Sequence, residues 1–217
     1  MTITQDERRS RGRPQVRPDD ETRHMIYEAA RHEFAERGFA ATTVDTVARR
    51  AGVSTKTVYR LIPTKALLFE GTIADRMDRF VASVELRGCN QKDPELALTA
   101  ALIACGELVF ADEVVSLYRM MLTESDRFPE LGETFYKTAM QRTVHALADW
   151  LRARVERGLI VLDDVETAAG MLLGMLVFEP QRAALYGHQP LPDRAAIAAR
   201  AQNCARLFLQ GCVKKAP

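Results

Sequence analysis

The chain has 217 residues, 47% of them hydrophobic and 27% charged, which is typical of a globular protein with one substantial core or with a small domain joined to a larger one. No segment approaches the ~20 consecutive apolar residues that a membrane-spanning helix needs, and the first ten residues are too polar for a secretion signal. We therefore expect a cytoplasmic protein without a membrane partner. The net charge of +1 argues against a protein that coats a polyanion by charge alone.

Positive charge is concentrated in one part of the chain. Residues 1–70 contain 13 lysines and arginines against 10 acidic residues, whereas the remainder contains 17 against 19. Between Arg37 and Lys65 there are six basic residues and one acidic residue, Asp45. A local excess of this kind suits a polyanionic partner.

The first 18 residues show no apolar periodicity, and the run from Arg8 to Pro18 contains five arginines and no acidic residue. A segment of this composition has too little apolar surface to fold by itself. We therefore predict a disordered basic arm at residues 1–18.

The segment that follows has the pattern of an amphipathic helix. Acidic residues 19–21 stand where a helix N-terminus favours negative charge. Ile26, Ala30 and Phe34 then recur at i, i+4 and i+8, and Gly38 is placed to end the helix.

Two short helices are predicted next. Thr43 is placed to cap the first and Gly52 to end it, while Ser54 is placed to cap the second. A helix-turn-helix needs apolar residues where its helices meet, a small residue where they touch, and a turn that tolerates positive φ. The apolar residues are Val44, Val47, Val53 and Val58. The small residue is Ala48, and the turn residue is Gly52. An ordinary helical hairpin is the alternative.

The second short helix carries an unusual outer face. If its apolar side faces the interior, helical geometry places Lys56 and Arg60 together on the opposite side, with Thr57 and Tyr59 beside them. Such a face offers cations and hydroxyl groups to base edges and phosphates in a DNA groove.

The rest of the chain keeps a helical pattern. Breaks fall at residues 88–94, around 112, at 127–129, at 158–164 and at 187–193. We predict an all-α fold of about nine helices, with a helix-turn-helix domain at 19–70 and a larger helical domain at 71–217.

Neither set of potential metal ligands has a convincing pattern. His24, Glu28 and His32 recur along the first helix, but on the face opposite its apolar residues, where polar side chains are common. The cysteines form no Cys-x-x-Cys pair and have no histidine at zinc-finger spacing, which favours a plain structural role for Cys89, Cys105, Cys204 and Cys212. We expect no metal and no cofactor.

Four segments between residues 21 and 70 carry a family pattern. They are Ile26–Ala30 with Phe34 and Gly38-Phe39, then Thr42–Ala48, Ala51–Ser54, and Thr57–Tyr59 through Pro63–Leu67. Together they resemble the DNA-binding domain of the TetR family of bacterial regulators. The resemblance implies a transcriptional regulator, usually a repressor, that binds double-stranded DNA as a homodimer at a palindromic operator.

The same resemblance implies individual DNA contacts. Thr43 and Lys65 are expected at phosphates, and the residues expected at the major groove are Thr55, Lys56, Thr57, Tyr59 and Arg60. Family members often carry His or Tyr at the position of Leu61 and Phe at that of Ile62, so Leu61 is left out of the contacts. Residues 11–14, Arg-Gly-Arg-Pro, are similar to the minor-groove core of an AT-hook, which implies that Arg11 and Arg13 lie in a minor groove. A solubilising tail is the alternative.

The larger domain has two expected roles. Residues 127–131 through 158–160 resemble a TetR subgroup of quorum-sensing and efflux regulators, and family members dimerise through their last two helices, here roughly 164–186 and 193–212. We expect an interface at Gly170, Gly174, Ala201, Ala205 and Phe208. The alternative is that these residues face the chain's own core.

A pocket for a small apolar or aromatic effector is expected among the middle helices, although Met and aromatic residues at helical spacing also suit a plain core. The candidate lining residues are Phe110, Tyr118, Met121, Phe135, Trp150 and Met171. The rival class, an all-helical enzyme or small-molecule carrier without a DNA role, leaves the basic segment from Thr43 to Lys65 unexplained. The chain has no catalytic motif that we recognise, so we expect no enzyme.

Overall fold

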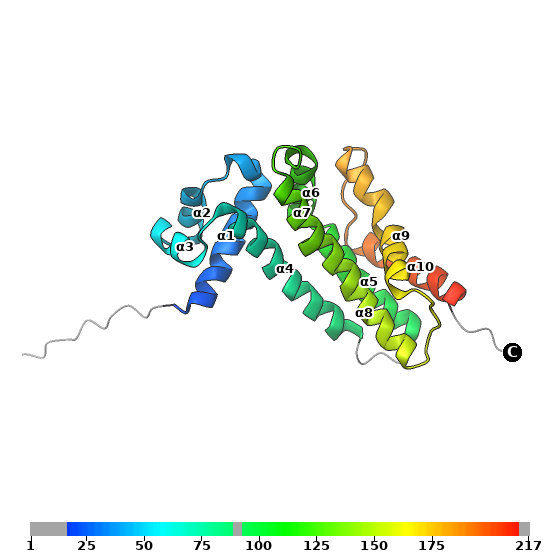
Figure 1. The fold of residues 1–217 in the computed structure, drawn as a ribbon. Coiled ribbons are helices and arrows are strands. Elements are labelled where there is room, and N and C mark those ends of the chain that lie inside the picture. Colours follow the sequence, from blue (N-terminus) through cyan, green and yellow to red (C-terminus); the bar gives the residue numbers. More distant parts are fainter. Residues whose placement is uncertain (1–16, 89–92, 213–217) are drawn as a thin grey trace, which may run out of the picture.

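The computed structural model describes residues 17–88 and 93–212, and every regular element in these ranges is helical (Figure 1). The elements are α1 (Asp19–Ala41), α2 (Val44–Ala51), α3 (Thr55–Leu61), α4 (Lys65–Gly88), α5 (Pro94–Val109), α6 (Asp112–Glu124), α7 (Pro129–Phe135), a π-helical segment η1 (Tyr136–Gln141), α8 (Arg142–Glu156), α9 (Val165–Leu185) and α10 (Arg194–Cys212). Because α7, η1 and α8 follow one another without a break, the described ranges contain nine continuous helices. The all-α prediction is confirmed, and none of the described helices is long and apolar enough to cross a membrane.

Helix α1 forms the centre of the N-terminal domain. Ile26, Ala30 and Phe34 are fully buried, as their spacing predicts. The chain leaves the helical path at Gly38, whose φ of 78° suits glycine, and the Thr42 hydroxyl donates to the Gly38 carbonyl at 2.7 Å. The predicted break is therefore present, and the chain turns there towards α2.

Helices α2 and α3 form the predicted helix-turn-helix. The Thr43 hydroxyl accepts the backbone N–H of Thr46 at 3.2 Å, and the Ser54 hydroxyl accepts that of Thr57 at 3.0 Å, so each helix has its predicted N-cap. Gly52 adopts the left-handed conformation between the helices, with φ of 69°. These caps define where both helices begin and therefore which residues of α3 face outward.

Helix α4 joins the two parts of the molecule (Figure 1). Its first turns bury Leu68 and Phe69 against the N-terminal domain, and its later turns bury Met77 and Phe80 in the larger domain, where α4 packs against α5 and α8. The expected boundary at residue 70 falls inside this helix. Helix α4 therefore contributes buried side chains to both parts of the molecule.

The larger domain is built around α5, which packs against α4 and α10. The close approach of α5 to α10 requires Gly106, since a Cβ at this position would lie 2.5 Å from Cγ2 of Ile197. Ala201 and Ala205 are fully buried in the same core, and Phe208 packs against it. The predicted placement of Ala201 and Ala205 in a dimer interface is therefore wrong, because α5 of the same chain already covers that face of α10.

Candidate nucleic-acid interface and ligand cavity

Helix α3 presents a charged and aromatic face to solvent. Tyr59 is 51% exposed, the Arg60 side chain is 56% exposed, and Lys56 is exposed as well. Val58, which lies between Thr57 and Tyr59 in the chain, is buried in the core of the helix-turn-helix. The three exposed side chains thus project from a helix whose orientation is set by its buried side.

Arg60 is paired in the free protein. Its guanidinium donates two hydrogen bonds to the Asp19 carboxylate, at 2.8 and 2.7 Å, from the C-terminal half of α3 to the first residue of α1. The hydrogen bond from Arg60 lowers the pKa of Asp19, and the same contact raises the pKa of Arg60. The helical pattern of α3 predicts the exposure of Arg60 but gives no sign of this partner, 41 residues away in the chain.

The threonines assigned to DNA contact hold local structure. Thr43 caps α2, the Thr55 hydroxyl donates to the Asp45 carboxylate at 2.8 Å, and the Thr57 hydroxyl lies 2.8 Å from that of Ser54. These bonds fix the ends of α2 and α3.

Lys65 lies at the start of α4, partly buried. Its Nζ donates to the Ala40 carbonyl at 3.3 Å and lies 4.4 Å from the centre of the Phe39 ring. Burial lowers the pKa of Lys65, so the ammonium gains from an anion placed on its open side. Arg11 and Arg13 lie outside the described residues.

A carboxylate of the larger domain holds the last turn of α1, just before the helix-turn-helix. Glu124, at the end of α6, accepts the backbone N–H of Phe39 at 3.1 Å and that of Ala40 at 2.9 Å. The Phe39 ring also packs edge-on against Phe128, with 5.3 Å between ring centres. The two domains therefore meet through directional bonds as well as through apolar contact.

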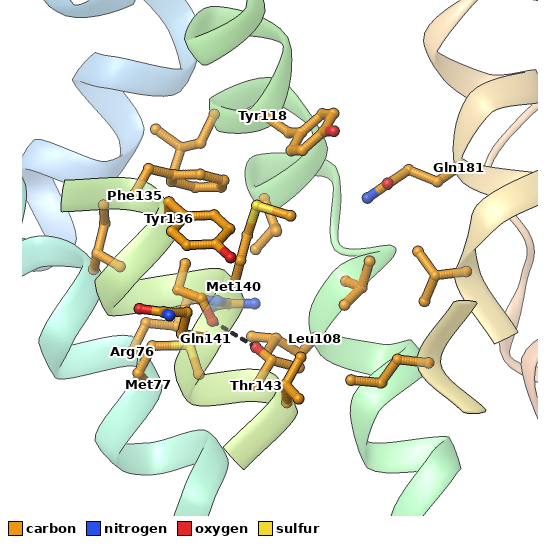
Figure 2. A pocket seen from close by; sticks show the side chains of 18 of the residues that line it. Arg76, Met77, Leu108, Tyr118, Phe135, Tyr136, Met140, Gln141, Thr143 and Gln181 are labelled. Atoms are coloured by element: carbon orange, nitrogen blue, oxygen red, sulfur yellow. Dashed lines mark hydrogen bonds between the residues drawn. The ribbon is translucent and has the colours of Figure 1, made fainter. Parts of the chain in front are cut away.

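A cavity of about 650 Å³ lies between α4, α6, the η1–α8 segment and α9 (Figure 2). Its lining is mainly apolar, and the Tyr118 and Phe135 rings line it with 6.1 Å between their centres. Figure 2 shows Tyr136 and Met140 pointing into the same space, with Gln181 of α9 on the opposite wall. A volume of this size fits a small organic molecule.

Four residues expected in the cavity lie elsewhere. Phe110 and Met121 are buried in the core, and Trp150 is buried beneath the Arg154 guanidinium, 3.6 Å from its ring centre. Met171 is 66% exposed and does not line the cavity, to which α9 contributes Leu173, Val177 and Phe178 among others. Placing these four in the cavity lining was therefore wrong.

The family follows from a match over most of the chain. A family model described as the C-terminal domain of AefR-like transcriptional repressors matches residues 96–211, more than half of the chain, and one described as bacterial regulatory proteins, tetR family, matches residues 26–72. The chain belongs to the TetR family. TetR-family proteins are DNA-binding transcriptional regulators and generally not enzymes, which is the class predicted from the sequence.

Similar proteins support the same assignment. The HTH-type transcriptional activator FasR of Mycolicibacterium smegmatis is 30% identical over 95 residues, which are 44% of this chain and 43% of FasR, less than half of each. A TetR-family regulator from Mesorhizobium loti superposes with a TM-score of 0.79 at 24% identity, over 90% of this chain and 98% of that one. The flavonoid-responsive regulator FrrA superposes with a TM-score of 0.70 at 26% identity, over 91% and 100%. The TetR fold thus extends over nearly the whole chain.

Helix α9 of this TetR-family chain lies far from the N-terminal domain (Figure 1), and several of its large apolar side chains are exposed. Met171, Met175 and Phe178 are 66%, 38% and 59% exposed, and Leu207 of the neighbouring α10 is 58% exposed. Gly170 and Gly174 are exposed too, and they line the mouth of the cavity. The expected interface therefore shifts towards the large side chains of α9.

The polar face of α1 in this TetR-family chain carries an ion-pair network. The His24 Nδ1 lies 3.0 Å from an Asp75 oxygen, and Arg79 donates to both Glu28 and Asp75, at 2.6 and 2.9 Å. Potential ligand atoms of His24, Glu28 and Asp75 lie within 4.8 Å of one another, and His32 is not among them. Because arginines already neutralise these carboxylates, the group has the chemistry of a salt-bridge network between α1 and α4.

Proposed function

We propose that this protein is a homodimeric repressor that binds a palindromic operator and leaves it when a small apolar or aromatic molecule occupies the cavity. The observation that carries the proposal is the outward face of α3, where Lys56, Tyr59 and Arg60 are exposed on a helix held by its Ser54 cap. A short helix of this kind reads a half-site of a few base pairs, so a second copy is needed for a specific operator.

The proposed DNA contacts divide into two kinds. Lys56, Tyr59 and Arg60, with Thr55 and Thr57 beside them, enter the major groove and contact base edges, where a guanidinium or an amine suits guanine. Thr43 and Lys65 contact phosphates, and the lowered pKa of Lys65 makes an added anion there favourable. The arm carrying Arg11 and Arg13 follows the adjacent minor groove.

Dimerisation uses the exposed side of α9 together with α10. The exposed apolar side chains are those of Met171, Met175, Phe178 and Leu207, which water contacts in the single chain. Their burial against a second copy stabilises the dimer. The two α3 helices of the dimer must lie about 34–36 Å apart to enter successive major grooves. Binding to a chromosomal operator also places the protein in the cytoplasm.

The effector acts through α6 and α4. Tyr118 of α6 lines the cavity, and Glu124 on the same helix holds the backbone of Phe39 and Ala40 next to α2. A molecule that displaces α6 therefore displaces the end of α1, which leads into the helix-turn-helix. FrrA is described as a flavonoid-responsive regulator, which supports an aromatic effector. FasR is described as an activator, so activation is the second candidate for the mode of regulation.

The proposal is tested on DNA upstream of the protein's own gene. Footprinting is expected to protect a palindrome, and fluorescence anisotropy at stated salt concentrations is expected to give an affinity far above that for a scrambled duplex. Uniform weak coating of both duplexes would contradict the proposal. A promoter fusion then separates repression from activation, because deletion of the gene raises reporter output in one case and lowers it in the other.

A further inference from the structure

Two arginines stand at one end of the cavity, and among the described residues neither has a hydrogen-bond acceptor for every N–H group. Arg76 of α4 and Arg31 of α1 both belong to the lining, in a wall that is otherwise largely apolar. The Arg31 side chain is 9% exposed and that of Arg76 is 24% exposed. Figure 2 shows Arg76 beside Gln141, on the side of the cavity opposite Gln181.

The carboxylates around these two arginines do not supply a hydrogen-bond acceptor for every guanidinium N–H group. Glu113 of α6 lies 3.7 Å from Nε of Arg31 and 3.9 Å from Nη1 of Arg76, so a single carboxylate approaches both guanidinium groups without a hydrogen bond to either. Glu28 accepts hydrogen bonds from both terminal nitrogens of Arg31, and it also accepts one from Arg79. Among the described residues, the buried Nε groups of Arg31 and Arg76 have no hydrogen-bond acceptor.

This arrangement favours an anion from outside the chain. An unsatisfied buried N–H is unfavourable, and a guanidinium binds a carboxylate through two parallel hydrogen bonds. Burial lowers the pKa of Arg76, and the nearby charge of Arg31 lowers it further. A negative charge beside Arg76 offsets both the loss of hydration and the repulsion between the two guanidinium groups.

We propose that the effector is a carboxylic acid with an apolar body, whose carboxylate accepts hydrogen bonds from Arg76 and whose body lies against Met140, Leu173 and Val177. The inference rests on the proposed function, in which this cavity holds the effector. It adds the chemical class of the ligand and the residue that selects it.

The position of the carboxylate also connects the ligand to the DNA-binding domain. Arg31 belongs to α1, Arg76 to α4 and Glu113 to α6, so three helices that meet the N-terminal domain converge on this end of the cavity. A bound carboxylate competes with Glu113 for both arginines and thereby changes the contact between α6 and α1.

The test uses matched pairs of acid and amide, decanoate with decanamide and 2-naphthoate with 2-naphthamide, and measures binding to the full-length protein by calorimetry. The acid of at least one pair is expected to bind roughly 10- to 100-fold more tightly than its amide, the range for a hydrogen bond to a charged group. Arg76→Gln is expected to abolish that preference while amide binding stays unchanged. Arg76→Lys keeps the charge and is expected to keep part of the preference.

Arg119→Gln is the matched control, because Arg119 is an exposed arginine on α6 outside this cavity, and it is expected to keep the wild-type preference. Equal affinity for acid and amide, binding of no acid at all, or an acid preference that persists in Arg76→Gln would each overturn the inference. Operator binding of the ligand-free protein is measured in parallel. Its presence beside any of these results refutes the carboxylate site alone, whereas its absence refutes the proposed function.

Discussion

The Glu124 carboxylate accepts the backbone N–H of Phe39 at 3.1 Å, across a separation of 85 residues in the chain. This bond joins the last residue of α6 to the end of α1, beyond the break at Gly38, and Glu124 also accepts the backbone N–H of Ala40. A side chain without these two hydrogen bonds could fill the same space, but it would not hold the backbone of Phe39 and Ala40 in one orientation.

We expect Glu124→Ala to weaken the response of operator binding to effector and to lower the free energy of unfolding by about 1–3 kcal/mol, because two backbone N–H groups lose a charged acceptor. Urea denaturation measures the second effect, and anisotropy with and without effector measures the first. Glu130→Ala, an exposed glutamate at the start of α7, is the control. An unchanged effector response in Glu124→Ala would separate this contact from regulation.

The outer face of α3 can be tested without disturbing the fold. Tyr59→Ala is expected to abolish tight operator binding while the melting temperature stays near that of the wild type, because half of the side chain is exposed. Lys56→Ala is expected to weaken binding, and its salt dependence reports the type of contact: a loss of about one unit of slope indicates a phosphate. Lys137→Ala, an exposed lysine on η1, controls for the loss of charge. Wild-type affinity in Tyr59→Ala would contradict the assignment of this face.

The ion pair between Arg60 and Asp19 competes with DNA for the guanidinium. Asp19→Asn is therefore expected to raise operator affinity by about two- to fivefold at low salt, the range set by exposed ion pairs, and to have little effect at high salt. Asp20→Asn removes the same charge from the neighbouring residue, whose carboxylate pairs with Arg23 instead. If both variants gain equally, the effect comes from net charge and the pair itself has no role.

Local signals in the sequence were sufficient to predict the helix-turn-helix. The caps at Thr43 and Ser54 and the left-handed Gly52 are decided by residues three or four positions away, so a pattern identifies them. The partners of these segments are set by distant residues instead. Neither Asp19 beside Arg60 nor Glu124 beside Phe39 leaves a signal in spacing, because only the packed structure brings them together.

The sequence predicted a cavity among the middle helices, but four of the six candidate lining residues lie outside it. Tyr136 and Met140 line the cavity four residues apart, as residues on one face of a helix do. That spacing does not say whether the face borders a cavity or a packed core, because the neighbouring helices decide this. The face of α10 was misassigned for a related reason, since Ala201 suits any close helix contact and the sequence does not say which helix provides it.

The contact between α5 and α10 predicts a difference between two glycines. Gly106→Ala is expected to lower the free energy of unfolding by about 1–3 kcal/mol, because the added methyl group would lie 2.5 Å from Ile197 and the core must shift. Gly170→Ala, where an added Cβ meets nothing within 4 Å, is expected to be neutral or to stabilise α9 by up to about 1 kcal/mol. Thermal or urea unfolding of both variants measures the difference, and equal stabilities would contradict the close approach of α5 to α10.

The apolar side of α9 predicts the oligomeric state. Met171→Glu introduces a charge at a side chain that is 66% exposed in the single chain, so the monomer is expected to fold normally. A dimer that buries this side chain must desolvate two carboxylates, so light scattering is expected to show a monomer, and operator affinity is expected to fall with the loss of the second half-site. Leu122→Glu makes the same change on α6, where the side chain is 63% exposed, and is expected to leave a dimer. A Met171→Glu protein that remains dimeric with full operator affinity would place the interface on another surface.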